Sequence, residues 1–74
     1  MSLSTAPRSR PLLVTGIRGA SPTTYRLMEM GLIEGARVEV LGCAPLGDPL
    51  HVRLGDYELS LRCDEADMID VAGA

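Results

Sequence analysis

The sequence has no lysine, tryptophan or phenylalanine, and it has only one histidine. Its seven basic residues are all arginines and stand singly along the chain against ten acidic residues, which gives a net charge of −3. A nucleic-acid-binding surface usually needs a basic stripe that neutralises phosphates. The scattered arginines of this acidic chain therefore argue against nucleic acid as a partner.

Long apolar runs are missing as well. None approaches the roughly 18 residues from which a membrane-spanning helix is inferred, and residues 1–11 lack the apolar stretch of a signal peptide. We therefore expect a cytoplasmic chain without a membrane-inserted segment. With 74 residues, 46% of them hydrophobic, it is long enough for one small folded domain.

The chain also lacks the usual constellations of catalysis and structural metal binding. Cys43 and Cys63 are too far apart in sequence for a Cys-x-x-Cys pair, and the two with His51 cannot complete a four-ligand zinc site. Ser60 is the only nucleophile expected near a base, and no orienting acid or oxyanion donors accompany it. No glycine-rich phosphate loop is present. We expect no enzymatic activity and two reduced thiols.

A short β-rich run predicts a strand at residues 12–17, and apolar residues that alternate with polar ones predict four more, at residues 36–42, 49–54, 57–63 and 69–71. Gly55-Asp56 separates two of these runs by two residues, which is typical of a tight hairpin. A register with this pair as the loop places the apolar residues of both strands on one face. The facing pairs are then Leu54 with Tyr57, Arg53 with Glu58, Val52 with Leu59, His51 with Ser60, Leu50 with Leu61, and Pro49 with Arg62. In this phase Cys63 points inward.

A helix is expected between the first two strands. Ser21 suits the N-cap and Pro22 the first helical position. The helix extends to about Met30, and Gly31 follows as a left-handed stop. The apolar side of the helix, expected to cap one end of a barrel, consists of Tyr25, Leu27, Met28 and Leu32.

These elements predict a mainly β fold, a small and partly open barrel of five strands with one helix inserted between the first and second. We expect residues 1–10 to form a disordered tail, residues 11–71 to form the domain, and residues 72–74 to fray. An open barrel edge permits weak pairing between copies of the chain.

The segment between the second and third strands is the strongest candidate for a contact with another protein. Two prolines and a glycine within six residues restrict its conformation, and it presents an exposed leucine. The exposed side of the helix supplies the rest of the hypothesised surface. The candidate partner-binding residues are Ala44, Pro45, Leu46, Gly47, Asp48, Pro49, Arg26 and Glu29.

Three stretches together resemble the FeoA family, the small accessory proteins of bacterial ferrous iron transport. They are Tyr25-Arg26-Leu27-Met28-Glu29-Met30-Gly31-Leu32-Ile33-Glu34-Gly35, Val38-Glu39-Val40 and Ala44-Pro45-Leu46-Gly47-Asp48-Pro49. The resemblance covers residues 11–71 and implies a cytosolic SH3-like barrel. It also implies a partner, the cytosolic part of the GTPase-linked ferrous iron permease FeoB. Because the chain has few aromatic residues, we expect no polyproline binding despite this fold.

Two alternative functions stay open. In the first, the chain is a transition-metal sensor or chaperone that binds Fe2+ or Zn2+ weakly through His51 and its diagonal neighbour Glu58, with no cofactor required. In the second, it is a free-standing SH3-like regulatory domain related to iron-dependent repressors, which carry the same barrel at their C-terminus. No helix-turn-helix pattern precedes the barrel in this sequence, so the accessory protein is preferred.

Overall fold

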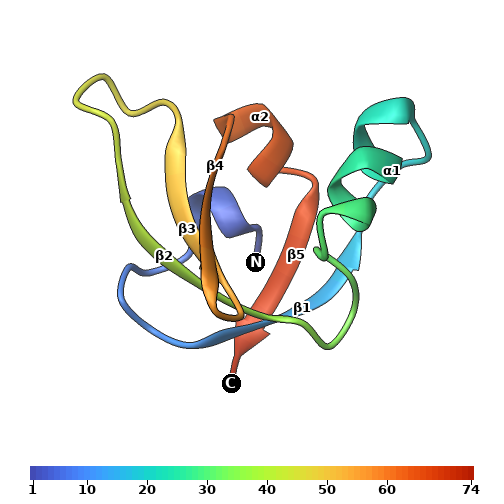
Figure 1. Ribbon diagram of the computed structural model, residues 1–74, viewed down its shortest axis with the longest axis horizontal. Helices are drawn as coiled ribbons and strands as arrows, with labels where there is room; N and C mark the ends of the chain where they lie inside the picture. Colours follow the sequence, from blue (N-terminus) through green and yellow to red (C-terminus); the bar gives the residue numbers. More distant parts are fainter.

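The computed structural model describes residues 1–74 and contains one antiparallel sheet of five strands in the order β4-β3-β2-β1-β5 (Figure 1). The helix α1 lies between β1 and β2 in the chain, which confirms the expected mainly β architecture. No helix is long and apolar enough to cross a membrane. The elements are η1 (Leu3–Thr5), β1 (Leu12–Ile17), α1 (Pro22–Glu29), β2 (Arg37–Cys43), β3 (Leu50–Leu54), β4 (Tyr57–Leu61), α2 (Cys63–Ala66) and β5 (Ile69–Gly73).

The β3–β4 hairpin has the register that the alternation of its residues predicts. Five of the six predicted pairs are confirmed, from Leu50 opposite Leu61 to Leu54 opposite Tyr57. The sixth, Pro49 with Arg62, is wrong, because β3 begins at Leu50 and β4 ends at Leu61. The apolar face is specified because a slip of one residue would turn every side chain of the strand to the other side. This hairpin therefore fixes the position of the loop that precedes β3.

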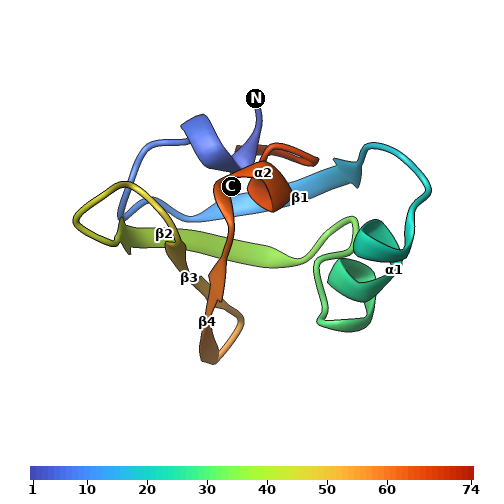
Figure 2. The ribbon, with the colours of Figure 1, turned by 90° about the horizontal axis from the view of Figure 1, so that it is seen from above.

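Irregularities in two other strand pairs accompany the curvature of the sheet. The register shifts between Val14 and Gly16 in the pairing of β1 with β5, and between Val40 and Gly42 in the pairing of β2 with β3. Such bulges bend a strand and increase its twist. Figures 1 and 2 show the curled sheet. It encloses one apolar core. The buried core residues are Leu3, Leu12, Val14, Leu27, Leu32, Val38, Val40, Leu50, Val52, Leu54, Leu61, Ala66, Ile69 and Val71.

Local sequence signals fix both ends of α1. At its start the Ser21 and Thr24 side chains each accept the other residue's backbone N–H, at 3.3 and 2.8 Å, in a capping box. At its end Gly31 has a φ of +107°, and the Leu32 N–H donates to the Leu27 carbonyl at 3.1 Å. This is the hydrogen bond of a glycine-terminated Schellman motif, and it confirms the expected stop.

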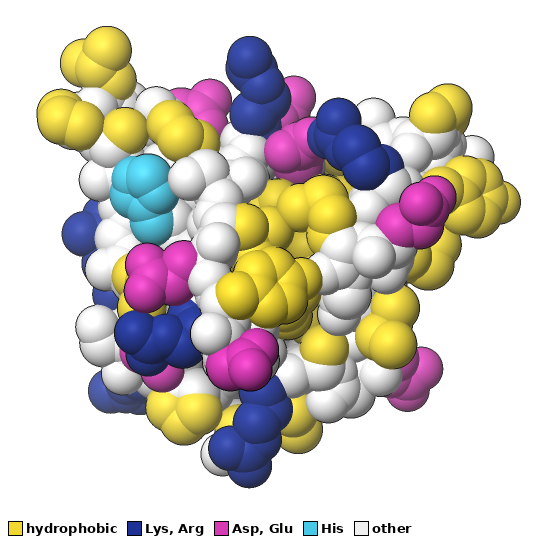
Figure 3. Space-filling model, viewed as in Figure 1, with side chains coloured by type: hydrophobic (Ala, Val, Ile, Leu, Met, Phe, Trp, Pro, Cys, Tyr) yellow, Lys and Arg dark blue, Asp and Glu magenta, His cyan; other side chains and the backbone are white.

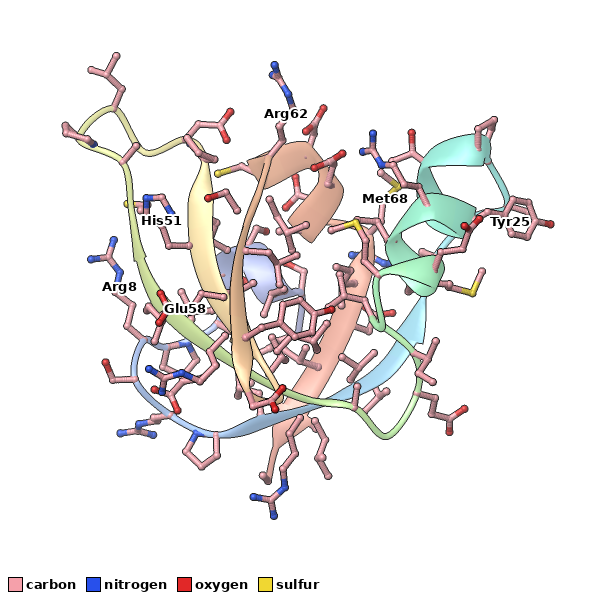
Figure 4. All side chains as sticks on the ribbon, viewed as in Figure 1. Arg8, Tyr25, His51, Glu58, Arg62 and Met68 are labelled. Atoms are coloured by element: carbon pink, nitrogen blue, oxygen red, sulfur yellow. The ribbon has the colours of Figure 1, made fainter.

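The buried side of α1 differs from the expected one. Thr24 and Leu27 are buried, whereas Tyr25 is 55% exposed and points into solvent (Figure 4). Tyr25 lies about 200° around the helix from Leu27, at 100° per residue, so the two cannot pack on the same surface. The prediction that Tyr25 caps the barrel is therefore wrong, and Leu27 has that role.

The first residues also differ from the predicted disordered tail. Leu3 is fully buried, and η1 packs against α2 and β5. The Met1 carbonyl accepts the Val71 N–H at 2.8 Å, and the Ser9 N–H donates to the Val40 carbonyl at 2.8 Å. The segment is ordered because the buried Leu3 side chain covers an end of the core, a contact that residue composition alone does not reveal.

The chain terminus is paired as well. The strand β5 continues to Gly73, which lies opposite Leu12 of β1, and the Ala74 N–H donates to the Pro11 carbonyl at 3.2 Å. Residues 72–74 are thus part of the sheet edge instead of frayed. The folded domain extends beyond the predicted limits of 11–71 at both ends.

Candidate functional site

The loop between β2 and β3 is an exposed and well-defined turn. The Gly47 N–H donates to the Ala44 carbonyl at 2.7 Å, and the Ala44 N–H donates to the Pro49 carbonyl at 3.0 Å. Proline at the second position of the turn and glycine at the fourth suit this geometry. Leu46, between them, is 97% exposed. The loop lies at the upper left of Figure 1, and hydrophobic side chains gather at that place in Figure 3, which has the same view. The structure thus presents a large apolar side chain on a constrained turn.

Cys63, the first residue of α2, is hydrogen-bonded to this loop. Its backbone N–H donates to Asp48 Oδ1 at 3.0 Å, and its thiol donates to the Gly47 carbonyl at 3.0 Å. The prediction that Cys63 points into the core in line with β4 is wrong, because β4 ends at Leu61 and the chain turns into α2. The half-buried thiol stabilises the loop through its hydrogen bond to the Gly47 carbonyl.

Desolvation raises the pKa of the Cys63 thiol above its ordinary value, and the Asp48 carboxylate raises it further through its charge and a hydrogen bond. The thiol therefore stays neutral to a higher pH than in the unfolded chain, and less reactive thiolate is present. We expect Asp48→Asn, which keeps the Oδ1 acceptor without the charge, to lower the pKa of Cys63 toward its ordinary value and so to accelerate alkylation of Cys63 near pH 8. Mass spectrometry of iodoacetamide-treated protein measures this rate, with Cys43 as the internal control. An unchanged rate of Cys63 alkylation would contradict the conclusion that Asp48 raises the pKa of this thiol.

A second link joins α1 to α2. The Arg26 guanidinium forms an ion pair with Glu65 Oε2, while Glu65 Oε1 accepts the Arg62 backbone N–H at 3.0 Å. The Glu65 side chain is only 13% exposed, so this carboxylate is largely enclosed by its partners. Arg26, predicted to bind a partner, is thus also committed to an internal contact, although most of its side chain stays exposed. Glu29 is exposed on the same helix.

The two segments that the sequence singled out thereby belong to one end of the barrel. Figures 1 and 3 show the loop, α2 and α1 in a row along this end, which we call the docking end and define as residues 44–49, 62–66 and the exposed side of α1. A shallow, open hollow of about 230 Å³ lies within it, lined by Asp48, Pro49 and Arg62.

Sequence reasoning missed the middle of the docking end. A carboxylate three residues after a helix start is a capping signal, and Glu65 stands in that position after Arg62. The usual serine or threonine at the cap is absent, and the sequence predicts only a short turn or helical turn over residues 64–68, with Asp64 as a possible cap. The structure has Arg62 at the N-cap of α2 instead. The role of α2 in joining the loop to α1 follows from contacts across the fold.

The two candidate metal ligands lie on the outer face of the β3–β4 hairpin (Figure 4). His51 Nδ1 lies 3.0 Å from Ser60 Oγ, and Glu58 is 3.8 Å from an Arg53 guanidinium nitrogen. Each side chain therefore already has a polar neighbour. No group of three or more His, Cys, Asp or Glu side chains is arranged to hold a metal ion. Weak Fe2+ or Zn2+ binding by His51 and Glu58 stays a prediction.

One curled antiparallel sheet of five strands, with a main helix between the first two, defines the class of small SH3-like β-barrel domains. Residues 1–73 match the family model described as the FeoA domain. The chain belongs to the FeoA family.

Relatives support this assignment at the level of sequence and of structure. The Fe(2+) transport protein A/Fe(2+) transporter FeoB fusion protein of Porphyromonas gingivalis is 35% identical over 71 residues, which are 96% of this chain and 8% of that protein. The iron(II) transport protein A of Clostridium thermocellum superposes with a TM-score of 0.93 at 31% identity, over 100% of this chain and 46% of that one. The chain thus spans less than half of either relative.

A third relative is similar in size to this chain. The FeoA of Stenotrophomonas maltophilia, solved in complex with zinc, is described as a procaryotic SH3 domain protein. It is 29% identical with a TM-score of 0.85, and the match covers 97% of this chain and 89% of that one.

Proposed function

We propose that this chain is a cytosolic accessory protein of bacterial ferrous iron uptake, which binds the cytosolic part of the permease FeoB and modulates it. The observation that carries the proposal is the fusion protein of Porphyromonas gingivalis, in which a sequence related to this one is joined to an FeoB transporter. Fusion keeps two modules at a high effective concentration relative to one another. The fusion therefore favours a direct contact between this chain and an FeoB transporter when the two are separate chains.

The docking end is the surface that suits this contact. Leu46 offers an apolar anchor at the tip of a constrained turn, and polar side chains border it, among them Asp48 and Arg62. Strong protein contacts commonly combine an anchor buried in a pocket of the partner with a polar rim. A turn held by its own hydrogen bonds and by Cys63 loses little conformational entropy on binding. In this proposal the chain catalyses no reaction and acts through binding alone.

Leu46→Asp tests the proposal. We expect affinity for the isolated FeoB GTPase domain to fall at least about tenfold, because burying a leucine contributes about 1.5–3 kcal/mol and 1.4 kcal/mol corresponds to a factor of ten. Calorimetric titration, with and without guanine nucleotide, measures the change. The fold should be unaffected because the Leu46 side chain touches almost nothing in the free protein.

The matched control is Ile33→Asp, the same kind of change at another apolar side chain, which is 52% exposed outside the docking end. It should leave the affinity unchanged. Equal affinities for the wild type and Leu46→Asp would exclude the loop as the contact, and a wild-type protein that does not bind the GTPase domain would remove the proposal itself.

A further inference from the structure

The free edges of the sheet are not equally protected. The outer side of β5 is bridged at Asp70 by Ser2 and bonded at Val71 by Met1, and the part of β2 around Val40 is bridged by residues 8–9. The N-terminal segment thus covers both places. The outer side of β4 has no such partner, and Figure 2 shows the β3–β4 hairpin projecting away from the N-terminal segment.

The hairpin register determines which backbone groups this bare edge presents. In a two-residue hairpin the pair next to the loop, here Leu54 and Tyr57, is hydrogen-bonded, and such pairs alternate with non-bonded ones along the ladder. Glu58 and Ser60 occupy the non-bonded positions opposite β3. Their backbone N–H and C=O groups therefore point away from β3, toward the side of β4 that has no neighbouring strand.

β4 lacks the features that usually protect an edge strand. Proteins blunt exposed edges with prolines, lysines, bulges or inward-pointing charges. The strand Tyr57–Leu61 contains no proline or lysine, its pairing with β3 shows no register shift, and its one charged residue is Glu58 on the outer face. It is a regular template for a further strand.

We propose that β4 pairs antiparallel with β4 of a second copy of this chain, centred on Leu59, so that the two sheets become continuous. This register pairs all five residues of each strand. Glu58 and Ser60 of one copy exchange backbone hydrogen bonds with Ser60 and Glu58 of the other. On the apolar face Leu59 meets its own copy, and Tyr57 meets Leu61.

The charge pattern of β4 favours this register between two copies, because it avoids a contact between like charges. Each Glu58 lies opposite a serine instead of another carboxylate, and the next residue across the same copy's ladder is Arg53. A parallel arrangement in register, or an antiparallel one centred on Glu58, would place two carboxylates directly opposite each other, which is destabilising in a sheet. The contact is short, so the interface is of the small, transient class.

Ser60→Pro tests the pairing, with Ser60→Ala as the matched control. Proline removes an N–H that faces solvent in the monomer, a position where edge strands tolerate it, and each dimer loses two hydrogen bonds. Alanine keeps the N–H and removes only the hydroxyl that contacts His51. Sedimentation equilibrium of the full chain between about 10 µM and 1 mM measures the dissociation constant.

We expect a concentration-dependent dimer for the wild type and Ser60→Ala, and a dissociation constant at least tenfold larger for Ser60→Pro. Isotope-filtered spectra of mixed labelled and unlabelled wild-type protein should show a contact between the Leu59 methyl groups of the two copies, a readout that holds if Ser60→Pro does not fold. A monomer at every concentration, a folded Ser60→Pro that still dimerises normally, or a dimer lost only in Leu46→Asp each overturns the proposal. None of these outcomes depends on binding to FeoB.

Discussion

Leu3→Asp is expected to lower the free energy of unfolding by at least about 3 kcal/mol, the largest effect foreseen for any exchange in the first ten residues. Leu3 is fully buried in the core, so the substitution removes apolar burial and places a carboxylate without a partner in an apolar environment. Domains of this size lose roughly 4–8 °C of thermal midpoint per kcal/mol, so the midpoint should fall by at least about 12 °C.

Thr5→Asp is the matched control, because it introduces the same charge into the same short helix at an exposed position. Its effect on the midpoint should be small, within about 0.5 kcal/mol. Thermal unfolding followed by circular dichroism compares the two variants. If the first ten residues were a disordered tail, both variants would unfold at the wild-type midpoint. A small effect of Leu3→Asp would therefore contradict the placement of Leu3 in the core.

Gly31→Ala is expected to cost about 2–3 kcal/mol, the second large effect. The residue ends α1 with a φ of +107°, where a side chain costs about 1–2 kcal/mol through contact with its own backbone. A Cβ at this position would also lie 3.1 Å from Leu54 Cδ2, a buried side chain of the core that has little room to move. Both terms oppose the folded state only.

Gly35→Ala separates these two causes. Gly35 has a φ of +90°, but a Cβ there would meet nothing within 4 Å. It should therefore show the backbone cost alone, about 1–2 kcal/mol, and the difference between the variants measures the crowding against Leu54. Urea unfolding at constant m gives both values. Equal losses would show that the core yields to the added methyl group and that strain in the turn is the whole effect.

Much of the fold could be predicted because the signals are local. The turn Gly55-Asp56 and the alternation on either side of it specify the β3–β4 register without help from the remaining chain. Ser21 and Gly31 likewise define the ends of α1 through bonds to residues within five positions. The loop tip at Leu46 was predicted to be exposed because two prolines and a glycine leave the turn few other conformations.

The candidate site was predicted only in part. The whole loop, Arg26 and Glu29 lie at the same end of the barrel, and their contact with a partner stays a prediction. Arg62, Cys63 and Glu65 were not expected there, because each acts through a partner far away in sequence.

The sequence by itself determined the order of the five strands and α1, the caps of α1 and the register of the β3–β4 hairpin, since each depends on residues close together in the chain. Only the tertiary structure decided that Leu3 completes the core, that Tyr25 faces solvent, and that Cys63 and Glu65 join the loop to α1. The physical reason is that these contacts depend on which surfaces meet once the sheet has curled. Hydrophobic periodicity identifies an apolar side chain, but the neighbouring elements in space decide which apolar side chain is buried.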